Sequence, residues 1–184
     1  MEDHQRVDER RLAAALRDQP PAAGGRVPYG GRQQGLFAGA HDRGVPGAAQ
    51  GTAGPYLYDL VEPCLGVEVP PELHEGEPWQ ALVESCADVS AWCNDVASLD
   101  KERGDAHNFV VIAASELGLS EPEALDWVLD RIAGRCADMR AAARRLPLDT
   151  LPVKVARDVS KVACAYLTAP RAHIDWITET ERYT

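Results

Sequence analysis

The stretch WQALVESCADVSAWCNDVASLDKE, from Trp79 to Glu102, decides the fold. Its apolar and sulfur-bearing side chains recur every three or four residues, which is the period of one face of an α-helix. This stripe consists of Leu82, Cys86, Val89, Cys93, Val96 and Leu99. We expect a long helix from Trp79 to about Glu102, with the stripe facing the core of a domain.

The rest of the chain after Pro55 is also typical of helices, since it combines helical periodicity with signals that begin and end helices. Alternating polar and apolar residues, which would indicate strands, do not occur there. The pattern therefore predicts an all-α fold. The expected helices are 55–66 ending at Gly66, 108–117 ending at Gly118, a helix capped by Ser120 and Glu123 that ends before Pro147, 151–167, and a last helix within 171–184.

The first part of the chain differs sharply in composition. Residues 1–54 hold ten of the fifteen glycines, and Ala, Gly, Arg and Pro fill 31 of these 54 positions. Such a segment cannot bury enough apolar surface to offset the entropy of ordering it. We expect residues 1–54 to be a disordered or non-homologous leader, and residues 55–184 to form the helical domain.

Charge and cysteine content exclude several classes of protein. The net charge is −10, which argues against a surface for nucleic acid or for anionic membranes. The apolar runs are too short to span a bilayer, and the N-terminus lacks a signal-peptide pattern. The five cysteines form no C-x-x-C pair and are expected to be reduced and mostly buried. The chain is therefore expected in the cytoplasm.

Oxygen-bearing side chains stand at intervals of four residues near the end of the long helix. Asn94, Ser98 and Glu102 lie one helical turn apart, so their side chains can approach a common point. An amide carbonyl, a hydroxyl and a carboxylate are hard donors, which suit Mg²⁺ better than zinc or copper. The cation of Lys101 would hold a phosphate at the same place. An ordinary solvated polar face is the alternative, and the spacing excludes an EF-hand loop.

Four short segments of the chain carry a family resemblance. NDVASLDKE (94–102) resembles the N-D-x-x-S-x-x-K-E metal motif of bacterial class I terpene synthases, and GDAHNFV (104–110) resembles the Gly-Asp turn and N-x-V segment that follow it. WITETERY (176–183) resembles the family's C-terminal W-S-x-x-T-x-R-Y motif. PYLYDLVE (55–62) resembles the helix that enters the site from the other side. The resemblance covers about residues 55–183.

This resemblance implies the C-terminal half of a helical terpenoid synthase bundle. The implied Mg²⁺ ligands are Asn94, Ser98 and Glu102, and the implied diphosphate contacts are Lys101, Arg182 and Tyr183. The implied reaction is that of a carbon–oxygen lyase: an allylic isoprenoid diphosphate, farnesyl or geranyl, is ionised and cyclised. The metal and the cations would stabilise the charge of the departing diphosphate. With farnesyl diphosphate the product would be a sesquiterpene.

Three departures from the family pattern point to an impaired remnant. The chain contains no two adjacent aspartates, so the aspartate-rich motif is missing. The arginine expected shortly before the 55–62 helix is also missing, since Arg43 is the nearest. The family has about two more residues between Glu102 and the Gly-Asp turn, which could misplace this carboxylate. We expect little or no cyclase activity from a C-terminal half that follows an unrelated leader.

Two other functions fit the same sequence. A non-catalytic helical interaction module would use its apolar stripe to pair with a second copy or with a complementary N-terminal half. A chain-elongating prenyltransferase fits less well, because those enzymes use two aspartate-rich motifs. The expected partners are thus an isoprenoid diphosphate and a further protein chain, with neither nucleic acid nor membrane.

Overall fold

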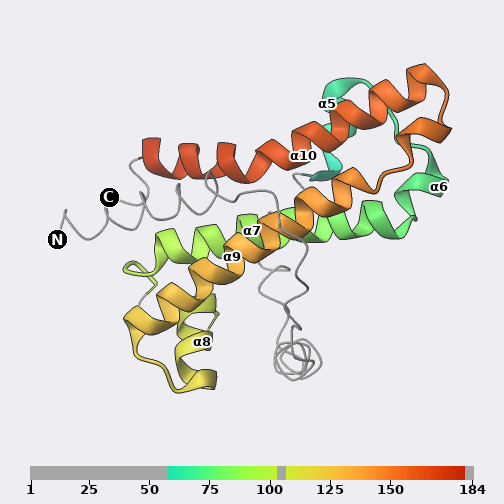
Figure 1. Cartoon of the computed structure of the whole chain (residues 1–184). Helices are drawn as coiled ribbons and strands as arrows, with labels where there is room; N and C mark the ends of the chain where they lie inside the picture. Colours follow the sequence, from blue (N-terminus) through green and yellow to red (C-terminus); the bar gives the residue numbers. More distant parts are fainter. Residues whose placement is uncertain (1–57, 103–106, 181–184) are drawn as a thin grey trace.

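The structure is a computed structural model that describes residues 58–102 and 107–180. The helices are α5 (Val61–Leu65), α6 (Pro71–His74), α7 (Glu77–Ser98), α8 (Phe109–Leu117), α9 (Glu121–Arg144) and α10 (Val153–Glu179), with a 3₁₀ turn at Leu148–Thr150 (Figure 1). No strand occurs in these two ranges, so the predicted all-α class is confirmed. The expected leader, residues 1–54, lies outside the described residues.

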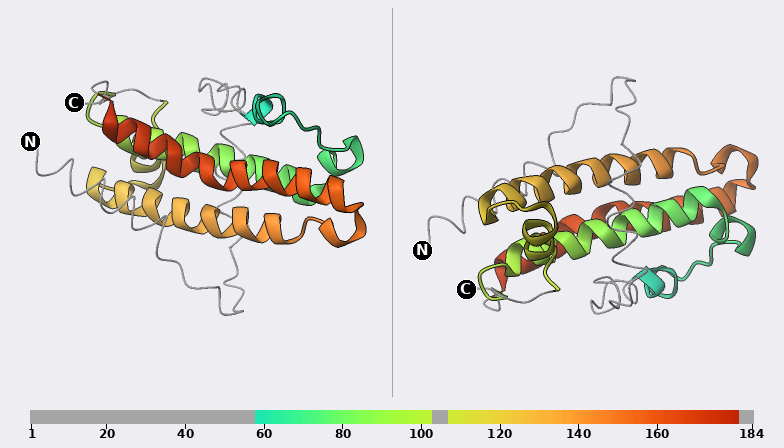
Figure 2. Two further views of the ribbon diagram at one scale, coloured as in Figure 1. Left: turned by 90° about the horizontal axis from the view of Figure 1, so that it is seen from above. Right: turned by 90° about the horizontal axis from the view of Figure 1, so that it is seen from below.

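Helix α7 is the central element of the molecule, because both α9 and α10 pack along it (Figure 2). Helix α9 runs antiparallel to α7, as the ion pairs Arg135–Asp88 at 2.7 Å and Arg145–Glu77 at 3.0 Å show. Helix α10 runs parallel to α7 on another side. The short helices α5 and α6 lie near the start of α7, and α8 lies near its end (Figure 1).

The predicted apolar stripe of α7 is confirmed in full, since all six of its side chains are at most 9% exposed. It divides between two clusters of buried residues. Leu82 and Cys86 pack with Tyr166 of α10 and Met139 of α9, whereas the later stripe residues pack with α8, α9 and the end of α10. Fully burying a Val or Leu side chain stabilises a fold by about 1.5–3 kcal/mol. The stripe therefore fixes α7 along its whole length.

The helix ends follow the sequence signals closely. Gly66 and Gly118 adopt the left-handed backbone conformation at the ends of α5 and α8, with φ of 63° and 66°. Ser120 and Glu123 form the predicted capping box of α9. Burial of three cysteines, Cys86, Cys93 and Cys136, agrees with the prediction that most are buried.

Helix α7 ends at Ser98, four residues before the predicted end at Glu102. Glu102 lies in the turn that follows, where its amide still donates to the carbonyl of Ser98 at 2.8 Å. The helical register thus extends for one more turn, although the regular helix has ended. Asp100 and Lys101 in this turn are exposed, so no apolar contact extends the helix there.

The prediction of two separate helices, 151–167 and one within 171–184, is wrong. Helix α10 continues through Pro170, which lies inside it and is buried. Proline lacks the amide hydrogen that would bond the carbonyl of Tyr166 four residues earlier. The thiol of Cys86 on α7 donates to that carbonyl instead, at 3.4 Å. A tertiary contact thus satisfies the carbonyl that the proline leaves without a hydrogen bond. Helix α10 also bends along its length (Figure 1).

This replacement bond can be measured by comparing two buried cysteines of α7. We expect Cys86→Ala to destabilise the fold by about 0.5–1 kcal/mol more than Cys93→Ala, because the thiol is a weak donor whose loss leaves a buried carbonyl unpaired. The measurement is chemical denaturation of both variants. In a Pro170→Ala background, residue 170 regains its amide hydrogen, so the difference should vanish. An unchanged difference there would contradict the assignment.

Thiol reactivity provides a second check on the packing. Cys64 and Cys164 are exposed, whereas burial raises the pKa of Cys86 to about 12 and of Cys136 to about 11. Burial raises the pKa of Cys93 as well. Because the thiolate is the reactive form, we expect a disulfide reagent at about pH 8 to modify Cys64 and Cys164 rapidly. The other three should react only after unfolding, and rapid modification of all five would contradict this packing.

Candidate metal and diphosphate site

Two of the three predicted metal ligands touch each other at the end of α7. The hydroxyl of Ser98, whose side chain is buried, donates to Oε2 of Glu102 at 2.7 Å. Asn94 lies one turn earlier on α7 and is half-buried. The structure therefore brings Ser98 and Glu102 together despite the short connection after Glu102, and it places Asn94 on the same helix at the predicted spacing.

A buried amide next to this pair is a feature that the sequence analysis missed. Asn108 is 1% exposed, and its Nδ2 donates to Glu102 Oε2 at 3.2 Å and to the carbonyl of Asp95 at 2.7 Å. Its Oδ1 accepts the amide of Val110 at 3.0 Å, which caps α8. Sequence reasoning placed Asn108 only at the start of a helix. An Asn before an apolar run signals a cap, but not a contact with the preceding helix.

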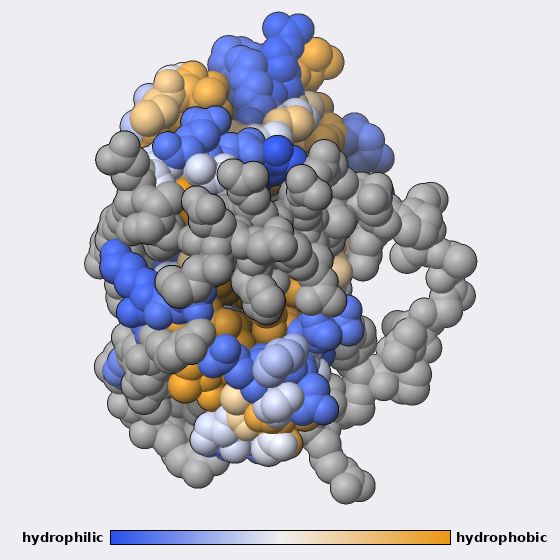
Figure 3. Space-filling view, turned by 90° about the vertical axis from the view of Figure 1, so that its left-hand side faces the viewer, coloured by the Kyte–Doolittle hydropathy of each residue, from blue (hydrophilic) through white to orange (hydrophobic). Residues whose placement is uncertain are grey.

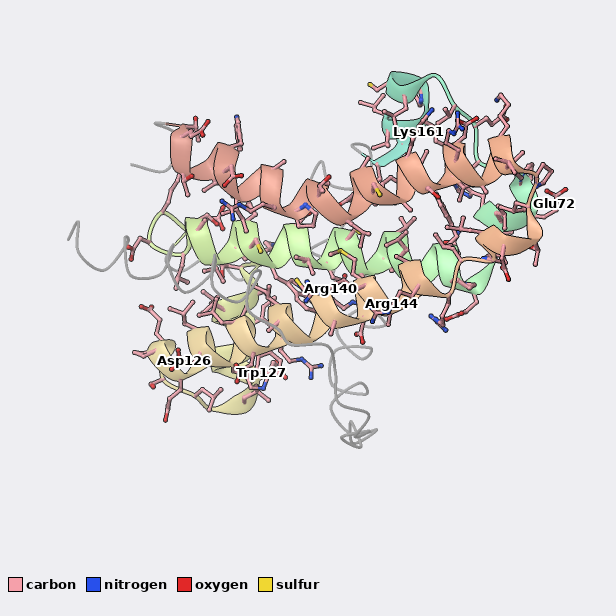
Figure 4. All side chains as sticks on the ribbon, turned by 45° about the horizontal axis from the view of Figure 1, so that its top comes forward. Glu72, Asp126, Trp127, Arg140, Arg144 and Lys161 are labelled. Atoms are coloured by element: carbon pink, nitrogen blue, oxygen red, sulfur yellow. The ribbon has the colours of Figure 1, made fainter. Side chains whose placement is uncertain are left out.

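The side chains around Asn108 fix α8 against the end of α7. Oδ2 of Asp95 accepts the amide of Phe109 at 3.0 Å, so a second side chain caps α8. The ring of Phe109 stacks on Trp92 of α7 with centroids 4.9 Å apart, and it contacts Trp127 of α9 at 6.0 Å. Trp127 lies on the part of α9 next to α8 (Figure 4). This aromatic row couples α7, α8 and α9.

The predicted diphosphate contacts lie partly beyond the described residues. Lys101 is exposed in the turn after α7, while Arg182 and Tyr183 fall outside the described part of the chain. Helix α10, which precedes them, ends at Glu179 at the same end of the molecule as the last turn of α7 (Figure 1). Ile174 in this part of α10 packs in the same cluster as Val96. Seen end-on, a group of apolar residues is visible in the lower part of this face, flanked by hydrophilic ones (Figure 3).

The donor set fits a hard divalent cation rather than a soft one. No group of three or more His, Cys, Asp or Glu side chains that could hold a metal ion occurs within 58–102 and 107–180. An amide, a hydroxyl and one carboxylate provide oxygen atoms only, which suits Mg²⁺. The C-terminal end of a long helix also carries partial negative charge, which favours a cation there. The oxygen donors of Asn94, Ser98 and Glu102 and the negative potential at the end of the helix are therefore both compatible with Mg²⁺.

Comparison with known proteins identifies the family. Residues 48–138 match the family described as "Terpene synthase family 2, C-terminal metal binding", and this range includes the Asn94, Ser98 and Glu102 positions. The chain is 30% identical over 132 residues to (-)-delta-cadinene synthase of Streptomyces clavuligerus, covering 68% of this chain and 40% of that protein. It is also 30% identical over 128 residues to (+)-T-muurolol synthase ((2E,6E)-farnesyl diphosphate cyclizing) of Roseiflexus castenholzii, covering 68% and 39%. The chain belongs to the terpene synthase family.

The fold comparison agrees with this assignment. Hedycaryol synthase, solved in complex with HEPES, matches 95% of this chain and 70% of its own with a TM-score of 0.61 at 20% sequence identity. The chain thus has the helical fold of a class I terpene synthase. It spans about 40% of the length of the cadinene and muurolol synthases. Among the helices within the described ranges, none combines the length and apolarity that crossing a bilayer requires.

Proposed function

We propose that this chain provides the C-terminal Mg²⁺–diphosphate site of a terpene cyclase, with Asn94, Ser98 and Glu102 holding the metal ion. The observation that carries the proposal is the 2.7 Å contact between Ser98 and Glu102 inside the segment that matches the family's metal-binding region. Glu102 supplies the negative charge, and the other two side chains supply neutral oxygens. Bound Mg²⁺ supplies Lewis-acid stabilisation of the charge that develops on a departing diphosphate.

Three further side chains bind the diphosphate in this proposal. Lys101 is exposed immediately before Glu102, where its ammonium group meets phosphate oxygens as a point charge. Arg182 offers a forked set of donors and Tyr183 a hydroxyl. The parallel course of α7 and α10 supports this grouping, because α10 ends at the same end of the molecule as the turn that carries Lys101 (Figure 1).

The substrate of the family reaction is proposed to be farnesyl diphosphate. The name of the Roseiflexus castenholzii relative specifies (2E,6E)-farnesyl diphosphate, which supports this choice. Because the sequence contains no adjacent aspartates, we propose that this chain binds diphosphate but ionises the substrate slowly, since ionisation needs several cations and a closed pocket. A second copy or a complementary N-terminal half would cover the apolar helix faces that line the pocket in this proposal. Residues 1–54 are a separate leader in this proposal, and the chain acts in the cytoplasm.

Calorimetry tests the proposed site. Inorganic diphosphate titrated into the chain with millimolar Mg²⁺ should bind, and chelation of the metal should abolish the binding. Glu102→Ala removes the one carboxylate of the metal site, and Arg182→Ala removes a forked diphosphate donor. We expect each to weaken binding at least tenfold, which corresponds to about 1.4 kcal/mol. Incubation with farnesyl diphosphate should yield little cyclised product.

Matched controls separate a site effect from a general charge effect. Glu116 of α8 and Arg171 of α10 are exposed residues on the described surface. Glu116→Ala and Arg171→Ala change the net charge as the two site variants do, and both should bind diphosphate like the parent chain. Binding that persists without Mg²⁺, or that Glu102→Ala leaves unchanged, would refute the metal site. An absence of binding in the parent chain would favour the helical interaction module.

A further inference from the structure

We infer that Asn108 is a positioning residue that fixes Glu102 so that its Oε1 atom faces a bound metal ion. This inference rests on the proposed Mg²⁺ site and adds a residue to it. Asn108 would not touch the metal or the diphosphate. It would act through the carboxylate of Glu102, from the start of the next helix.

The hydrogen bonds to Glu102 are distributed unevenly between its two oxygen atoms. Ser98 Oγ donates to Oε2 at 2.7 Å, and Asn108 Nδ2 donates to the same atom at 3.2 Å. Within the described part of the chain, Oε1 takes no hydrogen bond. Two donors on one oxygen set the plane of the carboxylate and leave the other oxygen available to a ligand. Ser98 also keeps its lone pairs while it donates its proton, so this bond does not prevent the hydroxyl from binding a cation.

The position of Glu102 makes such support necessary. Glu102 lies beyond the last residue of α7, in a turn, and its side chain is only half-buried. A glutamate side chain loses rotamer freedom when it is held in one orientation, and this loss opposes metal binding. Hydrogen bonds that already hold the Glu102 side chain in one orientation remove this freedom before the metal binds. Groups that orient metal ligands in this way strongly affect metal affinity.

Asparagine is suited to this position because it must both donate and accept. Its Oδ1 caps α8 at the Val110 amide, while its Nδ2 reaches the Asp95 carbonyl and Glu102. Aspartate would keep the cap but would have no donor at neutral pH, and its charge would repel the Glu102 carboxylate. Serine would keep a cap but is too short to span the same three contacts. Asn108 as a whole is 1% exposed, so the surrounding helices hold its side chain in place.

The test measures metal affinity and fold stability in the same variants of the full chain. We expect Asn108→Asp and Asn108→Ser to weaken Mg²⁺-dependent binding of inorganic diphosphate by about tenfold to a hundredfold. Ser120→Ala is the matched control, because it removes an N-cap from α9 without touching Glu102. This control should lower the melting temperature but leave the affinity unchanged. Asn108→Ser, which is neutral and retains a cap, gives the affinity if Asn108→Asp does not fold.

Each outcome decides between the inference and the function on which it rests. Affinity lost in the Asn108 variants and kept in Ser120→Ala supports the positioning role. If the parent chain binds diphosphate with Mg²⁺ and the Asn108 variants bind equally well, the inference is wrong while the metal site stands. If affinity falls in Ser120→Ala by as much as in Asn108→Ser, Asn108 acts only through stability and the inference is also wrong. A parent chain that does not bind overturns both.

Discussion

The burial of α7 between two other long helices is the constraint on which the rest of the structure depends. Helix α7 contacts α9 along one side and α10 along another, and its six stripe residues are at most 9% exposed. Because these contacts extend from Leu82 to Leu99, the helix cannot slide or rotate without exposing apolar surface. The packing along the helix therefore also fixes the position of the last turn of α7. A metal site at that turn needs only local polar contacts to complete it.

The same constraint explains two departures from regular helical structure. Helix α10 keeps Pro170 in its interior because α7 lies close enough for the Cys86 thiol to reach the carbonyl that the proline leaves open. Helix α7 ends within one residue of its last buried apolar side chain, Leu99, and the carbonyl of Asp95 in its last turn accepts a hydrogen bond from the buried amide of Asn108. In both places a side chain of one helix satisfies a backbone group of another.

Local signals in the sequence were sufficient to predict much of this fold. The stripe of α7, the glycines that end α5 and α8, and the Ser120–Glu123 box each depend on residues a few positions apart, so they can be read without the tertiary structure. The continuous α10 and the contact between Asn108 and Glu102 could not be predicted in this way. Each depends on which groups of distant segments meet, and a proline or an asparagine taken alone indicates only a helix boundary.

The charge of the proposed site links metal binding to diphosphate binding. Glu102 is the one carboxylate among the three proposed ligands, so the protein offsets only half the charge of Mg²⁺ and leaves the ion in need of an anion. A diphosphate supplies that charge, and the metal in turn reduces the repulsion between the diphosphate and an acidic chain of net charge −10. Each ligand therefore raises the affinity of the other by the same factor, as linkage requires. A site with a single oriented carboxylate is consequently sensitive to how that carboxylate is held. Its orientation controls both ligands, whereas a site with several carboxylates would distribute the same task among them.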